Sequence, residues 1–407
     1  MTPRFRLPLV ARPIDERDRA SSPLELLFDL TFVVAIGQAV TQLAHGIETG
    51  GGAAALLPFA LTFFAIWWAW MNFTWFSSGY DNDDSLYRVT TMMQMVGVLV
   101  LGSGIPAAFH DGDYAALVFG YFVMRFGLIT QWTRAAVSDA EHRRSAVRTI
   151  VGYGALQAGW VARLFVPEPW GVILSLVLIV LELSVPLWAA RAGDPGWNPG
   201  HIAERFGLFT IILLGESVLA AMTGFQRAVA DGLGVRLVFV ALSAVVILFA
   251  LWWLYYLQPS AEGLARRRRF SYVWAYGHYA AFGALAVLGA GLEVAVASTG
   301  DHGDVPTWVI ACAVTLPVAV FLVTLWAVNA QLTPQTALRA RVILPASALV
   351  AALPVAADYL QPVGVVGVAA LVCAAMVALA STDQAARAVL RGQLRGDPSG
   401  GAACRCR

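Results

Sequence analysis

The sequence predicts an all-α integral membrane protein with about twelve transmembrane helices, arranged as two parallel six-helix repeats with both termini cytoplasmic. Three observations predict this class. Hydrophobic residues make up 58% of the 407-residue chain and charged residues only 13%, whereas a soluble domain carries about 25% charged residues. The apolar residues come in blocks of about 20, the length of a helix that crosses the hydrocarbon core. Arginines alternate between dense and sparse segments along the chain.

Turn-forming residues separate the apolar blocks, so the elements can be placed in order. The breakers include "HGIETGGGA", "VPEPW", "GDPGWNPG" and "LQP". The predicted spans are 24–44, 56–76, 87–109, 113–134, 145–165, 169–190, 202–223, 235–257, 270–296, 305–329, 340–358 and 362–382. They divide the chain into a cytoplasmic N-terminal segment (1–22), a first repeat (23–195), a second repeat (196–383) and an arginine-rich cytoplasmic tail (384–407).

The distribution of arginine predicts the orientation. All 27 basic residues are arginines, and with the N-terminus inside, 23 of them fall in cytoplasmic segments, three fall outside and Arg125 falls within a span. Cytoplasmic loops carry such an excess of basic residues. The "RRRR" run at 266–269 fits this topology and anionic lipid headgroups better than nucleic-acid binding.

Four short matches in the same order indicate an internal repeat. "FDLTFVVAIGQAV" (28–40) resembles "FGLFTIILLGESV" (206–218), which aligns Gly37 with Gly215 and Gln38 with Glu216. "FAIWWAW" (64–70) matches "FALWWLY" (249–255), "LGSG" (101–104) matches "LGAG" (288–291), and "LITQW" (128–132) pairs with "LVTLW" (322–326). Each half has an even number of predicted spans, so the two repeats are expected to be parallel.

The segment that opens the second repeat carries a polar stripe. A charge at the bilayer centre costs about 2.5–3.5 kcal/mol, so it needs a partner or a water-filled cavity. Glu216 follows Arg205 by eleven residues, which is about 20° of rotation and about 16 Å of rise along a helix. His201 extends the stripe by one turn, with Glu204 to its side. The stripe predicts a polar path from the cytoplasm to the midplane.

Other spans also carry polar residues. Glu25 and Asp29 are i, i+4 neighbours near the cytoplasmic end of the first span, and two like charges there need an arginine, a cation or a proton. Gln38 continues with Gln42 and His45 toward the outside. Arg125 and Glu182 are expected near the midplane, where a structural ion pair competes with a role in transport. Helix capping competes with function for Glu25 and Asp29, and core packing is favoured for His278.

The acidic loop "YDNDDSLYR" (80–88) raises the question of a cation site. Asp81, Asp83 and Asp84 could hold a divalent cation through oxygen ligands, but solvated turn residues that start the next helix are favoured. A metal or lipid site at Cys404 and Cys406 is disfavoured. The chain has no phosphate-binding Gly-Lys-Ser/Thr loop and no His-Glu-x-x-His signature, so we expect no cofactor.

Three motifs together resemble the bacterial low temperature requirement protein A family. They are "SPLELLFDLTFVVAIGQ" (22–38), "YDNDD" with Tyr87 and Arg88, and "HIAERFGLFTIILLGESVLA" (201–220). Asn82 departs from the hydroxyl residue expected in many members, which weakens the cation interpretation. The resemblance implies a multispanning protein of the bacterial plasma (inner) membrane. The positions that match the motifs are Glu25, Phe28, Asp29, Asp81, Asp83, Asp84, Arg88, His201, Glu204, Arg205, Phe206, Gly207, Gly215 and Glu216.

Two mechanistic hypotheses follow, beside a structural or regulatory role. The first is an ion-coupled transporter or ion pathway, with the lipid bilayer and an unknown small solute or ion as partners. Its path residues would be Glu216, Arg205, His201, Glu204, Glu25, Asp29, Gln38, Arg125 and Glu182. The second is an intramembrane enzyme acting on a lipid or isoprenoid-like substrate, with Glu216 or Asp29 as general acid. Transport is favoured, because Gln38, Gln42 and His45 carry polarity outward beyond the midplane.

Overall fold

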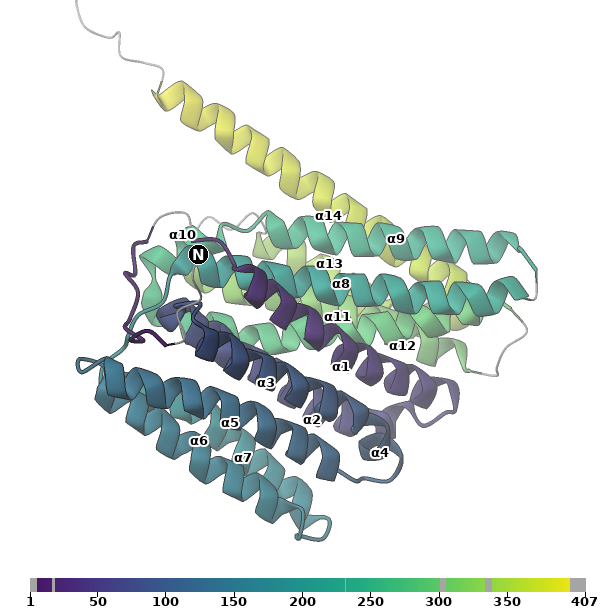
Figure 1. Ribbon diagram of the computed structural model, residues 1–407. Helices are drawn as coiled ribbons and strands as arrows, with labels where there is room; N and C mark the ends of the chain where they lie inside the picture. Colours follow the sequence, from purple (N-terminus) through teal and green to yellow (C-terminus); the bar gives the residue numbers. More distant parts are fainter. Residues whose placement is uncertain (1–5, 17–18, 231, 301–304, 334–338, 396–407) are drawn as a thin grey trace, which may run out of the picture.

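The computed structural model describes residues 6–16, 19–230, 232–300, 305–333 and 339–395, and every regular element in these ranges is a helix. Cys404 and Cys406 lie outside the described residues. Figure 1 shows the helices running roughly side by side across one bundle, with the yellow end of α14 projecting beyond it. The elements are α1 (Pro23–Glu48), α2 (Gly52–Tyr80), α3 (Ser85–Ser103), α4 (Ile105–His110), α5 (Ala115–Ser138), α6 (Arg143–Arg163), α7 (Trp170–Ala190), α8 (Pro199–Ala230), α9 (Val235–Tyr256), α10 (Ser260–Arg266), η1 (Arg268–Phe270), α11 (Ser271–Ala297), α12 (Thr307–Leu332), α13 (Ala340–Ala352), η2 (Leu353–Ala356) and α14 (Ala357–Arg395).

Ten segments of the described chain are long and apolar enough to cross a membrane. Two differences separate this number from the twelve predicted spans. α6 is helical, but its sequence contains four arginines and is less apolar than the other long helices. The predicted spans 340–358 and 362–382 lie within one continuous candidate segment, Ala340–Asp383, which is kinked at Gln361. The multispanning helical class is therefore confirmed, and the finer count stays a prediction.

Local sequence signals fix the starts of the helices that matter most for the site. At the start of α1, Ser22 accepts a hydrogen bond from the Glu25 amide, and the Glu25 carboxylate accepts one from the Ser22 amide. This reciprocal capping box satisfies two amides that a helix start otherwise leaves unpaired. Pro23 follows the cap, at a position that needs no amide donor. Asp84 caps α3 by accepting one hydrogen bond from the Tyr87 amide.

Small residues allow the central helices to approach closely. α3 lies along α5, and α11 lies along both α8 and α12. Gly97 of α3 faces Gly120 of α5, Gly289 of α11 faces Ser217 of α8, and Gly291 faces the backbone of α12. In lipid the hydrophobic effect does not drive helices together, so close packing at small residues carries much of the association. Gly97, Gly289 and Gly291 thus permit these close helix contacts.

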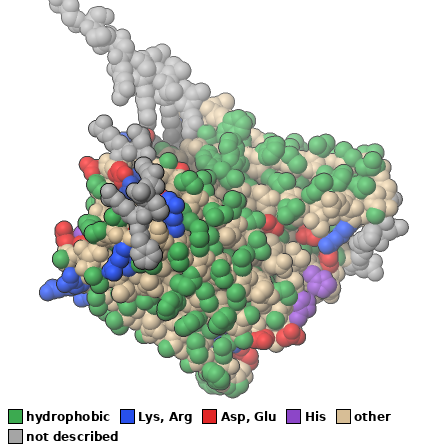
Figure 2. Space-filling view, viewed as in Figure 1, with side chains coloured by type: hydrophobic (Ala, Val, Ile, Leu, Met, Phe, Trp, Pro, Cys, Tyr) green, Lys and Arg blue, Asp and Glu red, His purple; other side chains and the backbone are tan. Residues whose placement is uncertain are grey.

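One end of the bundle, which we call the arginine-rich end, is closed by the N-terminal segment. This end holds the start of α1, the α2–α3 turn and the α10–η1 region with Arg266 to Arg269. Leu9 is fully buried there, and the Arg12 amide donates to the Gly79 carbonyl at 2.8 Å. Figure 2 shows blue side chains gathered toward this end, while hydrophobic side chains cover much of the flank between the two ends. The described part of the N-terminal segment is thus packed onto the bundle.

Candidate functional site

Four buried side chains from α1 and α8 form one charged group, which we call the Arg205 cluster. It consists of Glu25, Asp29, His201 and Arg205. The Arg205 guanidinium donates to Asp29 Oδ1 at 2.5 Å, and its other terminal nitrogen lies 3.1 Å from Glu25 Oε1. His201 Nε2 also lies 3.1 Å from Glu25 Oε1. Each of the four side chains is at most 2% exposed. Glu25 and Asp29, which lie one turn apart on α1, therefore share one buried arginine.

Helix α2 completes the surroundings of the Arg205 cluster. The Trp70 indole donates to Asp29 Oδ1 at 2.7 Å, and the Phe73 ring lies under the Arg205 guanidinium. Arg19 donates to the Ser77 carbonyl and lies 3.9 Å from Glu25. Several buried polar atoms in this region have no hydrogen-bond partner among the described residues, including Asp29 Oδ2, Arg205 Nε and Tyr87 Oη. The cluster therefore keeps capacity for water or a polar ligand.

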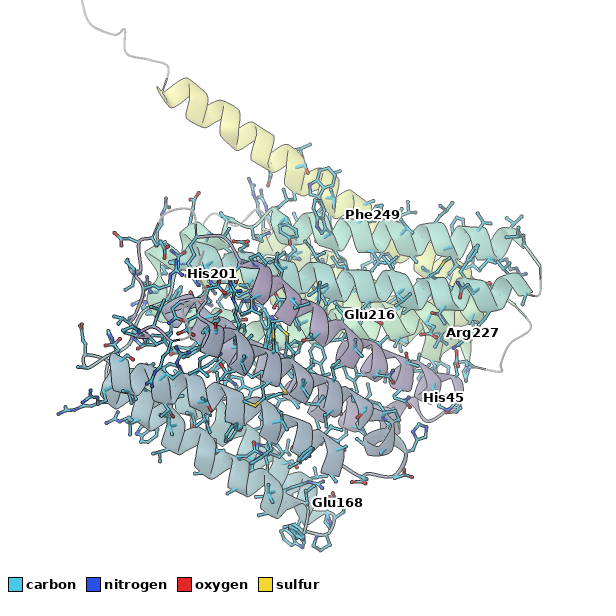
Figure 3. All side chains as sticks on the ribbon, in the orientation of Figure 1. His45, Glu168, His201, Glu216, Arg227 and Phe249 are labelled. Atoms are coloured by element: carbon cyan, nitrogen blue, oxygen red, sulfur yellow. The ribbon has the colours of Figure 1, made fainter. Side chains whose placement is uncertain are left out.

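Glu216 lies deeper along α8, and its surroundings differ from those of the Arg205 cluster. It is 7% exposed, yet it makes no hydrogen bond or ion pair with any described residue. Its carboxylate faces Gly37 of α1, where an added Cβ would lie 2.8 Å from Oε1. Figure 3 shows Glu216 between His201 near one end of α8 and Arg227 near the other. The residues of the predicted stripe, His201, Arg205 and Glu216, lie at different depths along α8. Arg205 pairs with Glu25 and Asp29 of α1 and not with Glu216.

A second charged group follows Glu216 toward the end opposite the arginine-rich end. Arg227 of α8 lies 2.7 Å from Glu48 and 3.0 Å from Glu293 of α11. Glu293 is 3% exposed, whereas the Arg227 side chain is partly open to the surface. Glu293 is also close enough to Glu216 for their charges to interact. α8 thus carries charged or polar side chains at three successive levels.

Aromatic rings fill the levels between the Arg205 cluster and Glu216. Trp70 packs on Phe209 with ring centroids 4.3 Å apart, and Phe28 packs on Phe32 at 5.0 Å. Phe32, Phe209 and Trp70 are fully buried. In this conformation the polar groups of α1 and α8 are separated by a packed apolar layer.

Arg125 and Glu182 form a separate buried pair between α5 and α7. Arg125 Nη2 donates to Glu182 Oε1 at 2.7 Å, and the Trp68 indole donates to Glu182 Oε2 at 2.8 Å. Trp160 adds a longer bond of 3.2 Å to Oε1. Arg125 thus pairs with Glu182 and not with Glu216.

The structure places the remaining predicted path residues away from these groups. Glu204 is exposed and accepts a hydrogen bond from the Ser21 amide. Gln38 is exposed on the surface of α1, and His45 is exposed near His110. His278 is a buried core histidine whose Nδ1 lies 2.7 Å from the Trp274 carbonyl oxygen.

The three aspartates of the α2–α3 turn point to different partners. Asp83 binds Arg88, Asp84 binds Arg134, and Asp81 lies 3.9 Å from Arg12. Within the described residues no group of three or more histidine, cysteine or acidic side chains could hold a metal ion. Asp84 caps α3, and Asp81 accepts a hydrogen bond from the Asp83 amide within the turn.

Burial has opposite net effects on two of these aspartates. Burial raises the pKa of Asp81 to about 6, and the nearby Glu25 charge adds to the shift. Burial also opposes ionisation of Asp84, but hydrogen bonds from the Leu7 and Tyr87 amides and from Arg134 outweigh it, so the pKa of Asp84 is lowered. Of these two aspartates, Asp81 is the one that titrates closer to neutral pH.

Comparison with known proteins decides the family. Residues 20–380 match the model of the bacterial low temperature requirement A protein family (LtrA). The chain belongs to this family. A protein of Rhizobium meliloti (strain 1021), described as uncharacterized, is 26% identical over 305 residues, which cover 69% of this chain and 71% of that protein. No solved structure matches the chain.

Several contacts of this LtrA family chain are not evident from sequence. Trp70 lies in the aromatic stretch "FAIWWAW", where nothing distinguishes it as a donor to Asp29. A buried indole N–H usually needs an acceptor, and that is the one signal that could have found it. Arg19 lies in a segment predicted only as polar and cytoplasmic. Its contact with Ser77 spans 58 residues and follows no local pattern.

Proposed function

We propose that this protein is an ion-coupled transporter or ion pathway of the bacterial inner membrane, in which Glu216 takes up and releases a proton or a small cation. The Arg205 cluster and the Arg227–Glu293 group would be the polar stations on its two sides. The aromatic layer between the Arg205 cluster and Glu216 would keep the route closed until helices α1 and α8 move.

The observation that carries this proposal is the isolated Glu216 carboxylate. An ionised side chain within a membrane is expensive unless it is paired or hydrated. Glu182 meets this requirement with Arg125 and two indoles, whereas the described residues offer Glu216 no donor. Gly37 has no side chain, so the Glu216 carboxylate can lie directly against α1. A proton or cation that binds reversibly would supply the partner that the described residues do not give the Glu216 carboxylate.

The Arg205 cluster supports a role in coupling. It joins α1 to α8 through one guanidinium held by two carboxylates. Breaking this contact would expose buried charges, so the two helices are expected to separate only if another cation or a proton compensates Glu25 or Asp29. Binding of that cation or proton to the Arg205 cluster would then be linked to movement of α8, which carries Glu216.

The predicted topology fits this proposal. We retain twelve spans in two parallel six-helix repeats with both termini cytoplasmic, and α6 would be the least apolar span. The close packing of α3 on α5 has a counterpart in that of α11 on α12. Gly37 and Glu216 come from the two aligned motifs, so the proposed ion site would lie where the repeats meet. The arginine-rich end would face the cytoplasm.

Labelling with a hydrophobic carbodiimide tests the proposal. The reagent modifies protonated carboxyl groups within membranes, and mass spectrometry locates the adduct. We expect the reagent to modify Glu216, and proton or cation flux in proteoliposomes to fall as the labelled fraction rises. The transported cation is expected to protect Glu216 from modification. Glu182 serves as the internal comparison, because its oxygens are occupied. Full flux in protein modified at Glu216 would contradict the proposal.

A further inference from the structure

Helices α2, α5, α6 and α7 line two cavities, one toward each end of the bundle. The first has a volume of about 60 Å³ and is lined by residues that include Trp68, Tyr121, Trp160, Arg163 and Glu182. The second, of about 70 Å³, lies toward the arginine-rich end and is lined by residues that include Asn72, Ser145, Thr149, Tyr153 and Asp194. All four helices contribute to both cavities. The two cavities therefore follow one axis through this part of the bundle.

A thin polar partition separates the two cavities. Arg125 bridges it, because its guanidinium contacts Glu182 and Tyr121 of the first cavity and lies 4.1 Å from the ring centroid of Tyr153 in the second. The Tyr153 hydroxyl donates to Asn72, which lines the second cavity. Arg125 is 3% exposed and Glu182 is fully buried. The partition is closed in this conformation, but it consists of hydrogen-bonding side chains.

Two side chains at the partition have unused hydrogen-bonding atoms. Arg125 Nη1 has no partner among the described residues, and neither Gln157 Nε2 nor Gln157 Oε1 has one. Gln157 lies one turn from Tyr153 on α6 and is 6% exposed. Buried polar atoms are nearly always paired with protein or water, so unpaired donors and acceptors beside two cavities indicate a polar occupant.

We propose that these four helices form a second route, separate from Glu216, for a small uncharged polar solute. The partition offers such a solute the unused Arg125 donor together with the unpaired donor and acceptor of the Gln157 amide. A cation in the first cavity would be opposed by Arg125 and Arg163, and an anion would be opposed by Glu182. A neutral molecule that has both donors and acceptors, such as a small amide, meets neither penalty.

The size and lining of the first cavity fit this class. Its volume corresponds to about two water molecules at about 30 Å³ each, or to one molecule of a few heavy atoms. Aromatic rings from α2, α5 and α6 line it, and they give a flat solute an apolar surface to lie on. Such a site combines mostly apolar walls with a few placed polar groups, as small-molecule sites commonly do. Urea is therefore a suitable probe.

The test is urea permeability of proteoliposomes, measured by stopped-flow light scattering. We expect wild type to raise urea permeability several-fold over protein-free liposomes. Ala65→Phe would fill the first cavity and Thr149→Phe the second, and each is expected to return permeability to the protein-free level. Leu181→Phe adds the same ring on the 45% exposed outer face of α7 and is expected to keep wild-type permeability.

The outcomes also separate this route from the one at Glu216. Ala65→Phe is expected to retain proton or cation flux, and gel filtration with circular dichroism verifies that each variant is folded. No gain in permeability with wild type would overturn the proposal. It would also be overturned if folded Ala65→Phe and Thr149→Phe conducted urea like wild type, or if guanidinium crossed by this route as fast as urea.

Discussion

The Arg205 guanidinium of α8 lies 2.5 Å from Asp29 Oδ1 of α1, across 176 residues of sequence. The same guanidinium lies 3.1 Å from Glu25, so one cation compensates two buried carboxylates. This contact joins the first helices of the two predicted repeats. It also explains how a family motif in α1 and one in α8 form a single structural unit.

Arg205→Gln should strongly destabilise the protein, because it leaves Glu25 and Asp29 buried without their cation. Removal of one partner of a buried ion pair typically costs about 3–5 kcal/mol. Thermal unfolding in detergent measures the effect. Arg88→Gln is the control, since the Arg88–Asp83 pair is more than half exposed and such surface pairs contribute little to stability. Equal losses in the two variants would contradict the assigned role of Arg205.

Trp70→Phe should separate the indole hydrogen bond from ring packing. The Trp70 N–H donates to Asp29, and a hydrogen bond to a charged group contributes about 1.5–3 kcal/mol. Trp67→Phe is the matched control, because Trp67 is equally buried but its N–H has no partner among the described residues. Unfolding of both variants should show Trp70→Phe as the less stable by about that amount. The hydrogen bond would be unimportant if the two losses were the same.

Asp81 should give the protein a stability that falls as pH rises toward neutral. Its pKa is raised from 3.8 to about 6, so the folded state holds the proton more tightly than the unfolded state. The stabilising contribution of this proton is complete below the unfolded pKa and is lost as pH rises through about 6. We expect Asp81→Asn to match wild type below the unfolded pKa of 3.8 and to be the more stable of the two at pH 7 and above.

Melting temperatures of wild type and Asp81→Asn across this pH range test the prediction. The difference between the two proteins cancels the titration of groups they share. A difference that stays constant from acid to neutral pH would show that Asp81 does not titrate in this window.

Gly37→Ala should impair ion flux while keeping every charge in place. The new methyl group would lie 2.8 Å from Glu216 Oε1 and would displace the carboxylate. Gly215→Ala is the matched control, since an added Cβ there meets nothing within 4 Å. Both changes favour helix by up to about 1 kcal/mol, so loss of fold is not expected to explain a difference. We expect a several-fold lower proteoliposome flux for Gly37→Ala alone, and unchanged flux would argue against an ion site there.

The fold class could be predicted from sequence because hydrophobic blocks and arginine placement act locally. Hydropathy alone does not settle α6, where four arginines offset the apolar residues, or the joined α13–α14 region. The predicted helix starts near Pro23 and Ser85 are confirmed, since capping depends on neighbouring residues.

The residues of the candidate site could be predicted from sequence, but most of the contacts between them could not. The helical spacing of Arg205 and Glu216 gives one face but cannot show that the Arg205 partners come from α1. Gln38 aligns with Glu216 in the predicted repeat, yet it is exposed, while its neighbour Gly37 faces that carboxylate. One residue on a helix turns by about 100°, so a motif alignment does not fix which side chain enters a site.

The central claim is tested most directly by ion flux through the purified protein in liposomes that contain a pH dye, under imposed proton or cation gradients, for wild type and Glu216→Gln. Glu262→Gln, an exposed change on α10, serves as the control. The account predicts flux with wild type and Glu262→Gln and its loss with Glu216→Gln, while all three proteins fold alike. Flux that persists in folded Glu216→Gln, or that is absent from wild type under every gradient, would contradict it.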